Sequence, residues 1–454
     1  MKITFLGGTG TVTGSKYLLE SSGFDGPVLV DCGLFQGLKN LRLRNWQGLP
    51  FDVKNLSAII LTHAHLDHTG YIPLLVKSGY KGPIYCSEAT YELCKILLPD
   101  SGHLQEEEAR YANKRGFSKH QPALPLYTLE DAQKSLQSFK PVRRHQKIPL
   151  SKQASFELFN AGHILGSSVV RIETEGKRLV FSGDLGRPDD LVMKPPESLP
   201  DCDYLVVEST YGNRKHERVD PVGLLKEIVD EAWANKGVVI IPSFAVGRAQ
   251  TLLYILSELN RQGKLPDIPV YLNSPMATNV THVFCHFQDE HRLSESQCKD
   301  TCDVAVYVQT PEESKTINQQ SGPMIIVSAS GMATGGRVVH HLKAFASDPK
   351  NIVLFAGFQA AGTRGAAMVH GADMIKIHGQ YIPVRAKVKC LDMLSAHADY
   401  MEILSWLQTS KHRPKKVFVT HGEPSASDSL RQKIEEELKW DVEVPFLGES
   451  RELK

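Results

Sequence analysis

Short apolar runs separated by glycine and polar residues dominate the first 209 residues of the chain. Runs of this length are typical of buried β-strands, and few helix-length patterns lie between them. The pattern therefore predicts a sandwich of mixed sheets rather than one parallel sheet. The expected strands are Lys2–Leu6, Lys16–Leu19, Val28–Val30, Ala58–Leu61, Ile84–Cys86, Phe156–Phe159, Val169–Ile172 and Leu179–Phe181.

The rhythm of the pattern changes after about residue 209. Residues Pro221–Ala234 have the spacing of an amphipathic helix, with Asp220 placed as its N-cap and proline at its first position, where it is tolerated. From there, strand-like runs alternate with helix-like segments, which indicates parallel βαβ units. The alternating segments are the strands Gly237–Pro242, Val270–Leu272, Met324–Val327 and Ile352–Phe355 and the helices Ala249–Leu259, Thr278–Phe287 and Arg337–Ala346.

The last part of the chain returns to the texture of the first, with the apolar strand Val417–Val419. At 454 residues the chain is longer than one typical domain, so we expect two. The predicted fold class is mixed α+β. A sandwich domain would be formed by residues 1–209 and closed by residues 389–454, with an α/β domain of residues 210–388 inserted into it.

The composition is that of an ordinary globular protein, with 41% hydrophobic and 23% charged residues. No apolar run approaches the roughly 20 residues of a membrane span, so we expect no membrane partner. The segment Met1–Gly8 is too short and glycine-broken for a signal peptide and fits a first strand. A net charge of +1 excludes a bulk polycation, so a nucleic-acid substrate would need a local basic groove.

Eight cysteines are scattered along the chain without a Cys-x-x-Cys pair, which favours a reducing cytoplasm over a disulfide framework. One cluster within residues 282–302 could bind a structural metal. The spacing of its last two cysteines fits one face of a helix equally well, so the sequence leaves the cluster open. Its members are His282, Cys285, His286, His291, Cys298 and Cys302.

A distinctive motif of six residues follows the expected strand Ala58–Leu61. Its sequence is His63-Ala64-His65-Leu66-Asp67-His68. Imidazole nitrogen and carboxylate oxygen are ligands that zinc prefers in proteins. In an extended segment His63 and His65 project to the same side, whereas Asp67 and His68 are adjacent and diverge. The motif can therefore offer one pair of ligands to one ion and the other pair to a second.

Four more polar residues come just after apolar strands, as His63 does. Alone, each would more often be an ordinary loop residue. Their recurrence is informative, because strand ends at one edge of a sandwich converge and the loops there carry function. Glycines beside three of them allow tight turns that aim the side chain. The four candidates are His163, Asp184, Glu208 and His421, and Asp31 after Val28–Val30 is a candidate to orient a ligating imidazole.

Taken in order, these motifs resemble those of the metallo-β-lactamase superfamily, and three of them resemble the extra motifs of its β-CASP branch, which processes nucleic acids. The likeness runs through nearly the whole chain and extends to bacterial and archaeal β-CASP ribonucleases and to the endonuclease subunit of the cleavage and polyadenylation specificity factor. A histidine at the last motif resembles the RNA-processing members. The β-CASP-like motifs are Glu208-Ser209-Thr210-Tyr211, Ser395-Ala396-His397-Ala398-Asp399 and Thr420-His421-Gly422-Glu423.

The resemblance implies an αββα metallo-β-lactamase sandwich with an inserted β-CASP domain, and a centre of two zinc ions. A hydroxide between the ions would be the nucleophile. His397 would protonate the leaving 3′ oxygen while Glu208 orients its imidazole, so the resemblance gives catalytic roles to these two residues and to Asp67 and Asp184. One zinc would be bound by His63, His65 and His163, the other by Asp67, His68 and His421, with Asp184 bridging.

A second region, Ser328–Arg337, joins a buried strand to a helix and is rich in small residues. Backbone N–H groups at a helix N-terminus can cradle a phosphate, but glycine-rich turns are also common for steric reasons. The family's matching loop lies near the substrate, which the resemblance carries over to this chain. The candidate substrate-binding residues are Ser330, Gly331, Gly335, Gly336 and Arg337, with Arg248 and Arg364 in two weaker loops.

The expected function is therefore a zinc-dependent ribonuclease that hydrolyses phosphodiester bonds of single-stranded RNA in RNA processing or degradation. Endonucleolytic cleavage is the expected mode, and the sequence leaves exonucleolytic cleavage open. Manganese or iron could occupy the same ligands. Dimers are common among the relatives, so a homodimer is a further expectation.

Two other functions stay open at this point. A thioester or lactone hydrolase of the same superfamily would share the metal ligands, but it has no evident need for the inserted domain or for Glu208 beside His397. A non-catalytic RNA-binding scaffold is the second alternative. It is disfavoured because all seven expected ligands are present.

Overall fold

The computed structural model describes residues 1–116, 120–217 and 219–454. Its contacts divide the chain into two compact units. Unit 1 comprises residues 1–190, 195–215 and 397–454, and unit 2 comprises residues 191–194 and 216–396. The domain boundaries predicted from the sequence lie at residues 209/210 and 388/389 and stay a prediction. The compact units divide at residues 215/216 and 396/397.

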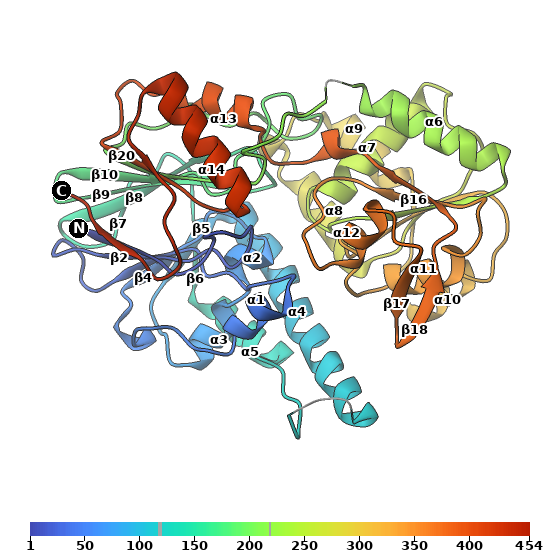
Figure 1. The fold of residues 1–454 in the computed structure, drawn as a ribbon, viewed down its shortest axis with the longest axis horizontal. Coiled ribbons are helices and arrows are strands. Elements are labelled where there is room, and N and C mark those ends of the chain that lie inside the picture. The colour runs from blue at the N-terminus through green and yellow to red at the C-terminus, as the bar shows by residue number, and fades with distance from the viewer. Residues whose placement is uncertain (117–119, 218) are drawn as a thin grey trace. The chain divides into compact units, whose positions relative to one another are not determined.

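Unit 1 contains two seven-stranded mixed sheets (Figure 1). The order of the first sheet is β22 (Ser450–Glu452), β1 (Lys2–Phe5), β2 (Tyr17–Glu20), β3 (Val28–Val30), β4 (Ala58–Ile60), β5 (Ile84–Ser87) and β6 (Phe139–Val142). The order of the second is β21 (Val442–Glu443), β20 (Lys416–Val419), β11 (Tyr204–Val207), β10 (Lys177–Phe181), β9 (Ser168–Thr174), β8 (Ala154–Asn160) and β7 (Ile148–Pro149).

The two sheets share an apolar core, and helices cover their outer faces (Figure 1). Strand β8 shows how the sequence achieves this, because Phe156 and Leu158 face the shared core and Phe159 packs on the outer cluster. That outer cluster lies beneath α13 (Tyr400–Leu407) and α14 (Pro424–Lys433). The helices on the side of the first sheet are α1 (Lys39–Arg44), α2 (Leu66–Thr69), α3 (Ile72–Lys77), α4 (Glu88–Arg115) and α5 (Leu129–Ser135).

Unit 2 is built on a six-stranded sheet in which every recorded strand pair is parallel. Its strand order is β14 (Val306–Tyr307), β13 (Val270–Leu272), β15 (Met324–Ser328), β12 (Val238–Pro242), β16 (Ile352–Phe355) and β19 (Lys387–Cys390). An antiparallel hairpin joins β17 (Met374–Ile377) to β18 (Gln380–Pro383). The helices are α6 (Pro221–Ala234), α7 (Arg248–Arg261), α8 (Pro275–His286), α9 (Glu295–Asp303), α10 (Pro311–Ile317), α11 (Val338–Phe345) and α12 (Arg364–Val369).

The predicted fold class is confirmed by the mixed sandwich of unit 1 and the parallel sheet of unit 2. The Asp220 cap is also confirmed, since its carboxylate accepts from the backbone N–H groups of Val222 and Gly223. Helix α8 begins three residues earlier than predicted, because the Ser274 hydroxyl caps it. Among the helices of the described ranges, none combines the length and the apolar character that a bilayer crossing requires.

Candidate metal centre

The predicted metal-ligating side chains come together in unit 1, where loops leave the ends of several strands. The loop after β4 supplies the His63–His68 motif, in which His65 precedes α2 and Asp67 and His68 lie within it. The strands β10, β11 and β20 are parallel neighbours, so their ends meet at the same edge. The residues that follow these three strands are Asp184, Glu208 and His421, and His163 follows β8.

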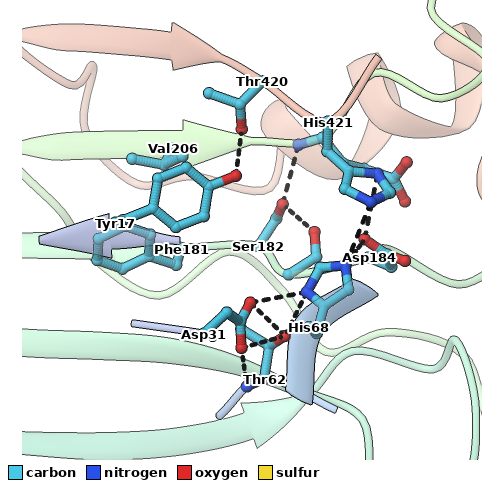
Figure 2. Close-up of a pocket in the computed structure, with 12 residues that line it drawn as sticks. Tyr17, Asp31, Thr62, His68, Phe181, Ser182, Asp184, Val206, Thr420 and His421 are labelled. Carbon is cyan, nitrogen blue, oxygen red and sulfur yellow. Dashed lines mark hydrogen bonds and ion pairs between the residues drawn. The ribbon is translucent and has the colours of Figure 1, made fainter. Parts of the chain in front are cut away.

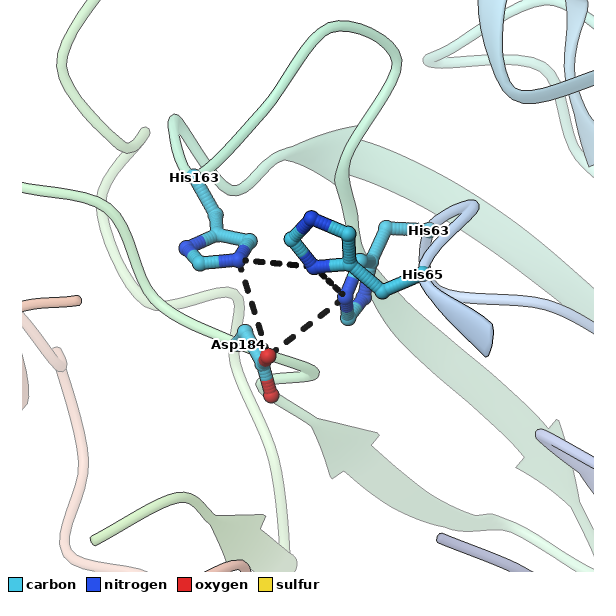
Figure 3. Close-up of side chains that lie close together, drawn as sticks. All are labelled: His63, His65, His163 and Asp184. Atoms are coloured by element: carbon cyan, nitrogen blue, oxygen red, sulfur yellow. Dashed lines mark hydrogen bonds and ion pairs between the residues drawn. The ribbon is translucent and has the colours of Figure 1, made fainter. Parts of the chain in front are cut away.

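The first group of ligand atoms belongs to His63, His65, His163 and Asp184 (Figure 3). Nε2 of His63 lies 3.1 Å from Nδ1 of His65, which in turn lies 3.3 Å from Nε2 of His163. One carboxylate oxygen of Asp184, Oδ2, lies 3.4 Å from His63 and 3.6 Å from His163. Three imidazole nitrogens and one oxygen therefore converge on a common point.

The second group belongs to Asp67, His68 and His421. Nε2 of His68 lies 3.2 Å from Nε2 of His421, and Oδ2 of Asp67 lies 3.4 Å from the same His421 atom. The other oxygen of Asp184, Oδ1, lies 3.3 Å from Nε2 of His68. Because Oδ2 of Asp184 faces the first group and Oδ1 faces the second, this carboxylate lies between the two.

The spacing of these atoms fits a tetrahedral metal. A zinc–nitrogen bond of about 2.05 Å places tetrahedral ligand atoms roughly 3.3 Å apart. The observed separations of 3.1 to 3.6 Å in the first group match that edge length. The facing ring nitrogens of His68 and His421 also fit a shared cation.

Burial sets the charge state of several of these groups. Burial and the neighbouring His68 imidazole lower the pKa of His63 well below its usual value, and burial lowers the pKa of His65 to about 4. Both are then neutral, which is the form that binds metals. Burial works against the charge of Asp184, but the imidazoles of His421 and His68 hold its pKa well below the usual value.

Asp31 orients one of the predicted ligands (Figure 2). Its Oδ2 lies 2.8 Å from Nδ1 of His68, and its Oδ1 accepts from the backbone N–H of Thr62 at 2.8 Å. This leaves Nε2 of His68 to face the second group. Carboxylates that hold ligating imidazoles in this way fix the ring orientation and the tautomer.

The backbone at the centre has an unusual conformation at residues that position these side chains. Asp31 and His421 have φ angles of 58° and 48°, in the left-handed region that non-glycine residues seldom occupy. Gly162 and Gly183, which precede His163 and Asp184, adopt the same region without strain. The predicted glycine turns are thus present at two of three positions, while at the third His421 itself takes the strained conformation.

A carboxylate–imidazole pair adjoins the first group. Nδ1 of His397 lies 3.1 Å from Oε1 of Glu208, and Oε2 of Glu208 accepts from the backbone N–H of Thr210 at 3.2 Å. The His397 ring lies 4.5 Å from that of His163. Burial works against the charge of His397, but the Glu208 carboxylate raises its pKa to about 9.

Two hydroxyls at the centre were missed in the sequence. Thr62 Oγ1 donates to Oδ2 of Asp31 at 2.9 Å, and Thr210 Oγ1 lies 3.2 Å from Nδ1 of His421. Thr62 directly precedes the His63 motif and Thr210 lies within the Glu208 motif, which is the signal that could have found them. Their residue type alone is uninformative, because threonine is common in strand-end loops.

The predicted substrate-binding residues lie in unit 2, apart in sequence from the ligand motifs. The guanidinium of Arg337 donates to Oδ1 of Asn273 and to the backbone carbonyls of Val308 and Gln309. That of Arg364 donates to the carbonyls of Lys376, Ala333 and Thr334. Arg248 is buried at the start of α7, and Ser330, Gly331, Gly335 and Gly336 lie in the loop after β15. Their contact with RNA stays a prediction.

The cysteine and histidine cluster of unit 2 has a different geometry from the centre. Sγ of Cys285 lies 3.1 Å from Sγ of Cys302, and Sγ of Cys298 lies 3.8 Å from Nε2 of His291. Within the described part of the chain, the groups of three or more ligand atoms close enough to share an ion all belong to unit 1. The recorded side-chain contacts within the cluster are thus one between a thiol of α8 and a thiol of α9, and one between a thiol of α9 and an imidazole.

Three domain families match the chain. The Metallo-beta-lactamase superfamily domain matches residues 18–194, the Beta-Casp domain residues 249–368, and the Zn-dependent metallo-hydrolase RNA specificity domain residues 381–445. Ribonuclease TTHA0252 from Thermus thermophilus is 36% identical over 430 residues, which cover 93% of each chain. The chain belongs to the β-CASP branch of the metallo-β-lactamase superfamily. The resemblance stated from the sequence motifs is confirmed.

Other β-CASP relatives align along most of the chain. An RNase J-like protein from Methanocaldococcus jannaschii is 31% identical over 428 residues, or 93% of each chain. Transcription termination factor FttA from Methanosarcina mazei is 30% identical over 457 residues, which cover 97% of this chain and 69% of the relative. A solved protein of unknown function from Enterococcus faecalis V583 covers 99% of both chains with a TM-score of 0.52 at 12% identity, a likeness of fold alone.

Proposed function

We propose that this β-CASP protein is a zinc-dependent ribonuclease that hydrolyses phosphodiester bonds of single-stranded RNA. The observation that carries the proposal is the placement of two groups of ligand atoms beside the Glu208–His397 pair. The match of residues 381–445 to an RNA specificity domain and the name of the 36% identical ribonuclease support RNA as the substrate.

The ligand groups fit two metal ions. We propose that His63, His65 and His163 hold one zinc, that Asp67, His68 and His421 hold the other, and that Asp184 bridges them. When bound, the ions would lower the pKa of water towards neutrality and offset negative charge on the phosphate. Asp31 would keep the His68 ring aligned with its zinc, through the contact with Nδ1.

His397 is the proposed general acid. Because Glu208 accepts from Nδ1 of the imidazole, the proton to be transferred would lie on Nε2. That proton would pass to the leaving 3′ oxygen as the phosphorus–oxygen bond breaks. Proton transfer by a positioned side chain typically contributes a factor of about 10² to 10⁴ in rate.

The depth of the ligands favours a single strand as the substrate. His63, His68, His163, Asp184 and His421 are all buried, so the scissile phosphate must enter a recessed site. An unpaired strand can bend to reach such a site, whereas a duplex is stiff. We propose internal cleavage as the mode.

The free thiols of all eight cysteines support a reducing compartment such as the cytoplasm. The homodimer stays a prediction.

The test is cleavage of a 5′-labelled single-stranded RNA by the wild type, Asp184→Ala and His397→Ala, with metal analysis of each. The wild type should give a ladder of internal products. Asp184→Ala should lose both metal and activity, whereas His397→Ala should keep its metal and lose about 10²- to 10⁴-fold in kcat. Asp189→Ala, an exposed carboxylate in the same loop as Asp184, is the matched control and should behave as the wild type.

Three results would change the conclusion. Unchanged cleavage by His397→Ala would remove the general acid. Products shortened only from one end would replace internal cleavage by an exonucleolytic mode. Hydrolysis of thioesters or lactones without any cleavage of RNA would establish a small-molecule hydrolase instead.

A further inference from the structure

The buried segment directly after β3 is tied to the turn that carries the predicted ligands. The backbone N–H of Cys32 donates to the carbonyl of His68 at 2.7 Å, and that of Leu34 donates to the carbonyl of Leu66 at 2.8 Å. Gly33 makes this close approach possible, because a Cβ there would lie 1.5 Å from the carbonyl oxygen of Asp67. The segment that follows is thus anchored to the metal-binding turn.

A buried amide fixes α1 to this anchored segment. The side chain of Asn45, at the C-terminal end of α1, accepts from the backbone N–H of Phe35 at 2.9 Å and donates to its carbonyl at 2.8 Å. Two cations contact the Phe35 ring, with the Lys16 ammonium 4.6 Å and the Arg44 guanidinium 5.5 Å from its centroid. Asn45 and Phe35 therefore hold the end of α1 in a defined place relative to the ligand turn.

The exposed side of α1 and of the turn after it carries two cations and an aromatic ring. Lys39 and Arg42 are spaced i and i+3 on α1, and Trp46 lies in the turn that follows the helix. All three are exposed, and the indole of Trp46 is 57% exposed. The backbone N–H of Trp46 donates to the carbonyl of Leu43 at 3.2 Å, so a hydrogen-bonded turn links the end of α1 to the tryptophan.

Exposed apolar side chains gather around these three residues. Leu38 and Leu43 on the same segment are exposed, and Leu104 and Tyr111 are exposed on α4, which lies beside α1 in Figure 1. Burial raises the pKa of Glu108 on α4 and the charge of Arg42 offsets part of that rise, so the two side chains lie near each other. A protein usually buries an indole, so an exposed one beside cations indicates a binding surface.

We infer that Trp46, Arg42 and Lys39 form a subsite for single-stranded RNA, in which a base stacks on the indole and the two cations contact flanking phosphates. This inference rests on the proposed function. Aromatic platforms beside cations are the usual means of holding unpaired nucleotides without reading their sequence. The link from Trp46 through Asn45 and Phe35 to the ligand turn would keep the stacked base at a fixed place relative to the scissile phosphate.

A matched series at position 46 tests the stacking. Trp46→Ala and Trp46→Leu should each weaken binding of a fluorescently labelled RNA about tenfold, whereas Trp46→Phe, which keeps an aromatic face, should stay within about threefold. Trp233→Ala is the control, because Trp233 on α6 is also exposed, at 42%. Anisotropy measures binding without turnover, so this test stands even if the protein does not cleave RNA.

Two more measurements separate the subsite from the centre. Hydrolysis of bis(p-nitrophenyl) phosphate, a small phosphodiester, should be unchanged in all Trp46 variants, because it needs only the centre. Arg42→Ala should reduce the slope of log Kd against log salt concentration by about one. The inference is overturned if the alanine variant binds RNA as the wild type does, or if the phenylalanine and leucine variants lose affinity equally. If the wild type does not hydrolyse bis(p-nitrophenyl) phosphate, that result instead contradicts the proposed function.

Discussion

The candidate metal centre of unit 1 and the loop after β15 in unit 2 occupy similar places in the fold, yet their polar side chains make different contacts. Asp184, Glu208 and His421 of the centre follow the ends of buried parallel strands, as the loop after β15 does, and both regions include glycines. At the centre, the side chains face one another at the spacing of metal ligands. In the loop, the Arg337 guanidinium donates to an asparagine and two carbonyls of its own unit.

The difference teaches that the place of a polar residue in the fold does not by itself reveal its role. A charged side chain at a strand end can bind a ligand, or it can satisfy neighbouring backbone groups. What distinguishes the centre is that several independent segments contribute atoms to the same point. The loop has one guanidinium whose acceptors are already supplied by the protein.

Lys16 extends this comparison to a buried charge near the ligand turn. Its recorded contacts include no carboxylate. Its ammonium donates to the carbonyl of Gly14 at 3.2 Å and lies over the rings of Phe35 and Tyr71. Burial lowers the pKa of Lys16 to about 8. We expect Lys16→Met to raise the free energy of unfolding at pH 7 by up to about 3 kcal/mol without changing metal content.

The difference in unfolding free energy between Lys16→Met and the wild type should depend on pH. Between about pH 8 and the usual lysine pKa near 10.5, the unfolded state binds more protons at this position than the folded state. The stability of the wild type should therefore gain on that of Lys16→Met as the pH rises through this window, and the difference should be greatest below it. Denaturant unfolding at pH 7 and pH 10 measures it. An equal difference at both values would show that Lys16 is not the buried charge described here.

Asp31 tests whether the carboxylate behind a ligand belongs to the centre. Its contact with Nδ1 of His68 should set the orientation of that ring. Asp31→Ala should weaken metal binding about 10- to 100-fold, and excess zinc should restore much of the activity. The matched control is Asp25→Ala, an exposed carboxylate shortly before β3. Unchanged metal affinity in Asp31→Ala would make this carboxylate a structural group only.

Substitution of Arg337 is expected to have the smallest effect. It tests the loop after β15, the second region of the comparison. Its hydrogen bonds predict that Arg337→Ala lowers the free energy of unfolding by about 1–2 kcal/mol. The KM for RNA should change by less than about twofold. Denaturation and steady-state cleavage measure the two quantities. A large rise in KM with unchanged stability would support the predicted role of this arginine in binding phosphate.

The sequence predicted much of the fold because the hydrophobic pattern differs between the two parts of the chain. Alternation along β8, with Phe156 inward and Phe159 outward, reflects a strand covered differently on its two faces. The parallel sheet of unit 2 followed from strand and helix alternation. Helix ends were less predictable, since the start of α8 depends on the hydroxyl of Ser274.

The centre was predictable for a different reason, namely the density of imidazoles and carboxylates in separate motifs. Its supporting groups were harder to foresee. The hydroxyls of Thr62 and Thr210 carry no signal in their residue type, and their roles depend on contacts made across the fold. The strained backbone of His421 also depends on the whole fold, because no local sequence rule places a histidine at a positive φ.

The most direct test of the central claim is the metal stoichiometry of the purified protein and of Asp184→Asn and His421→Ala. Zinc-loaded wild type should contain two zinc ions per chain. Asp184→Asn, which keeps the shape but removes the charge between the two groups, should weaken binding of both ions. His421→Ala should leave about one. Two tightly bound ions in all three proteins, or none in the wild type, would contradict a centre assembled from these strand-end loops.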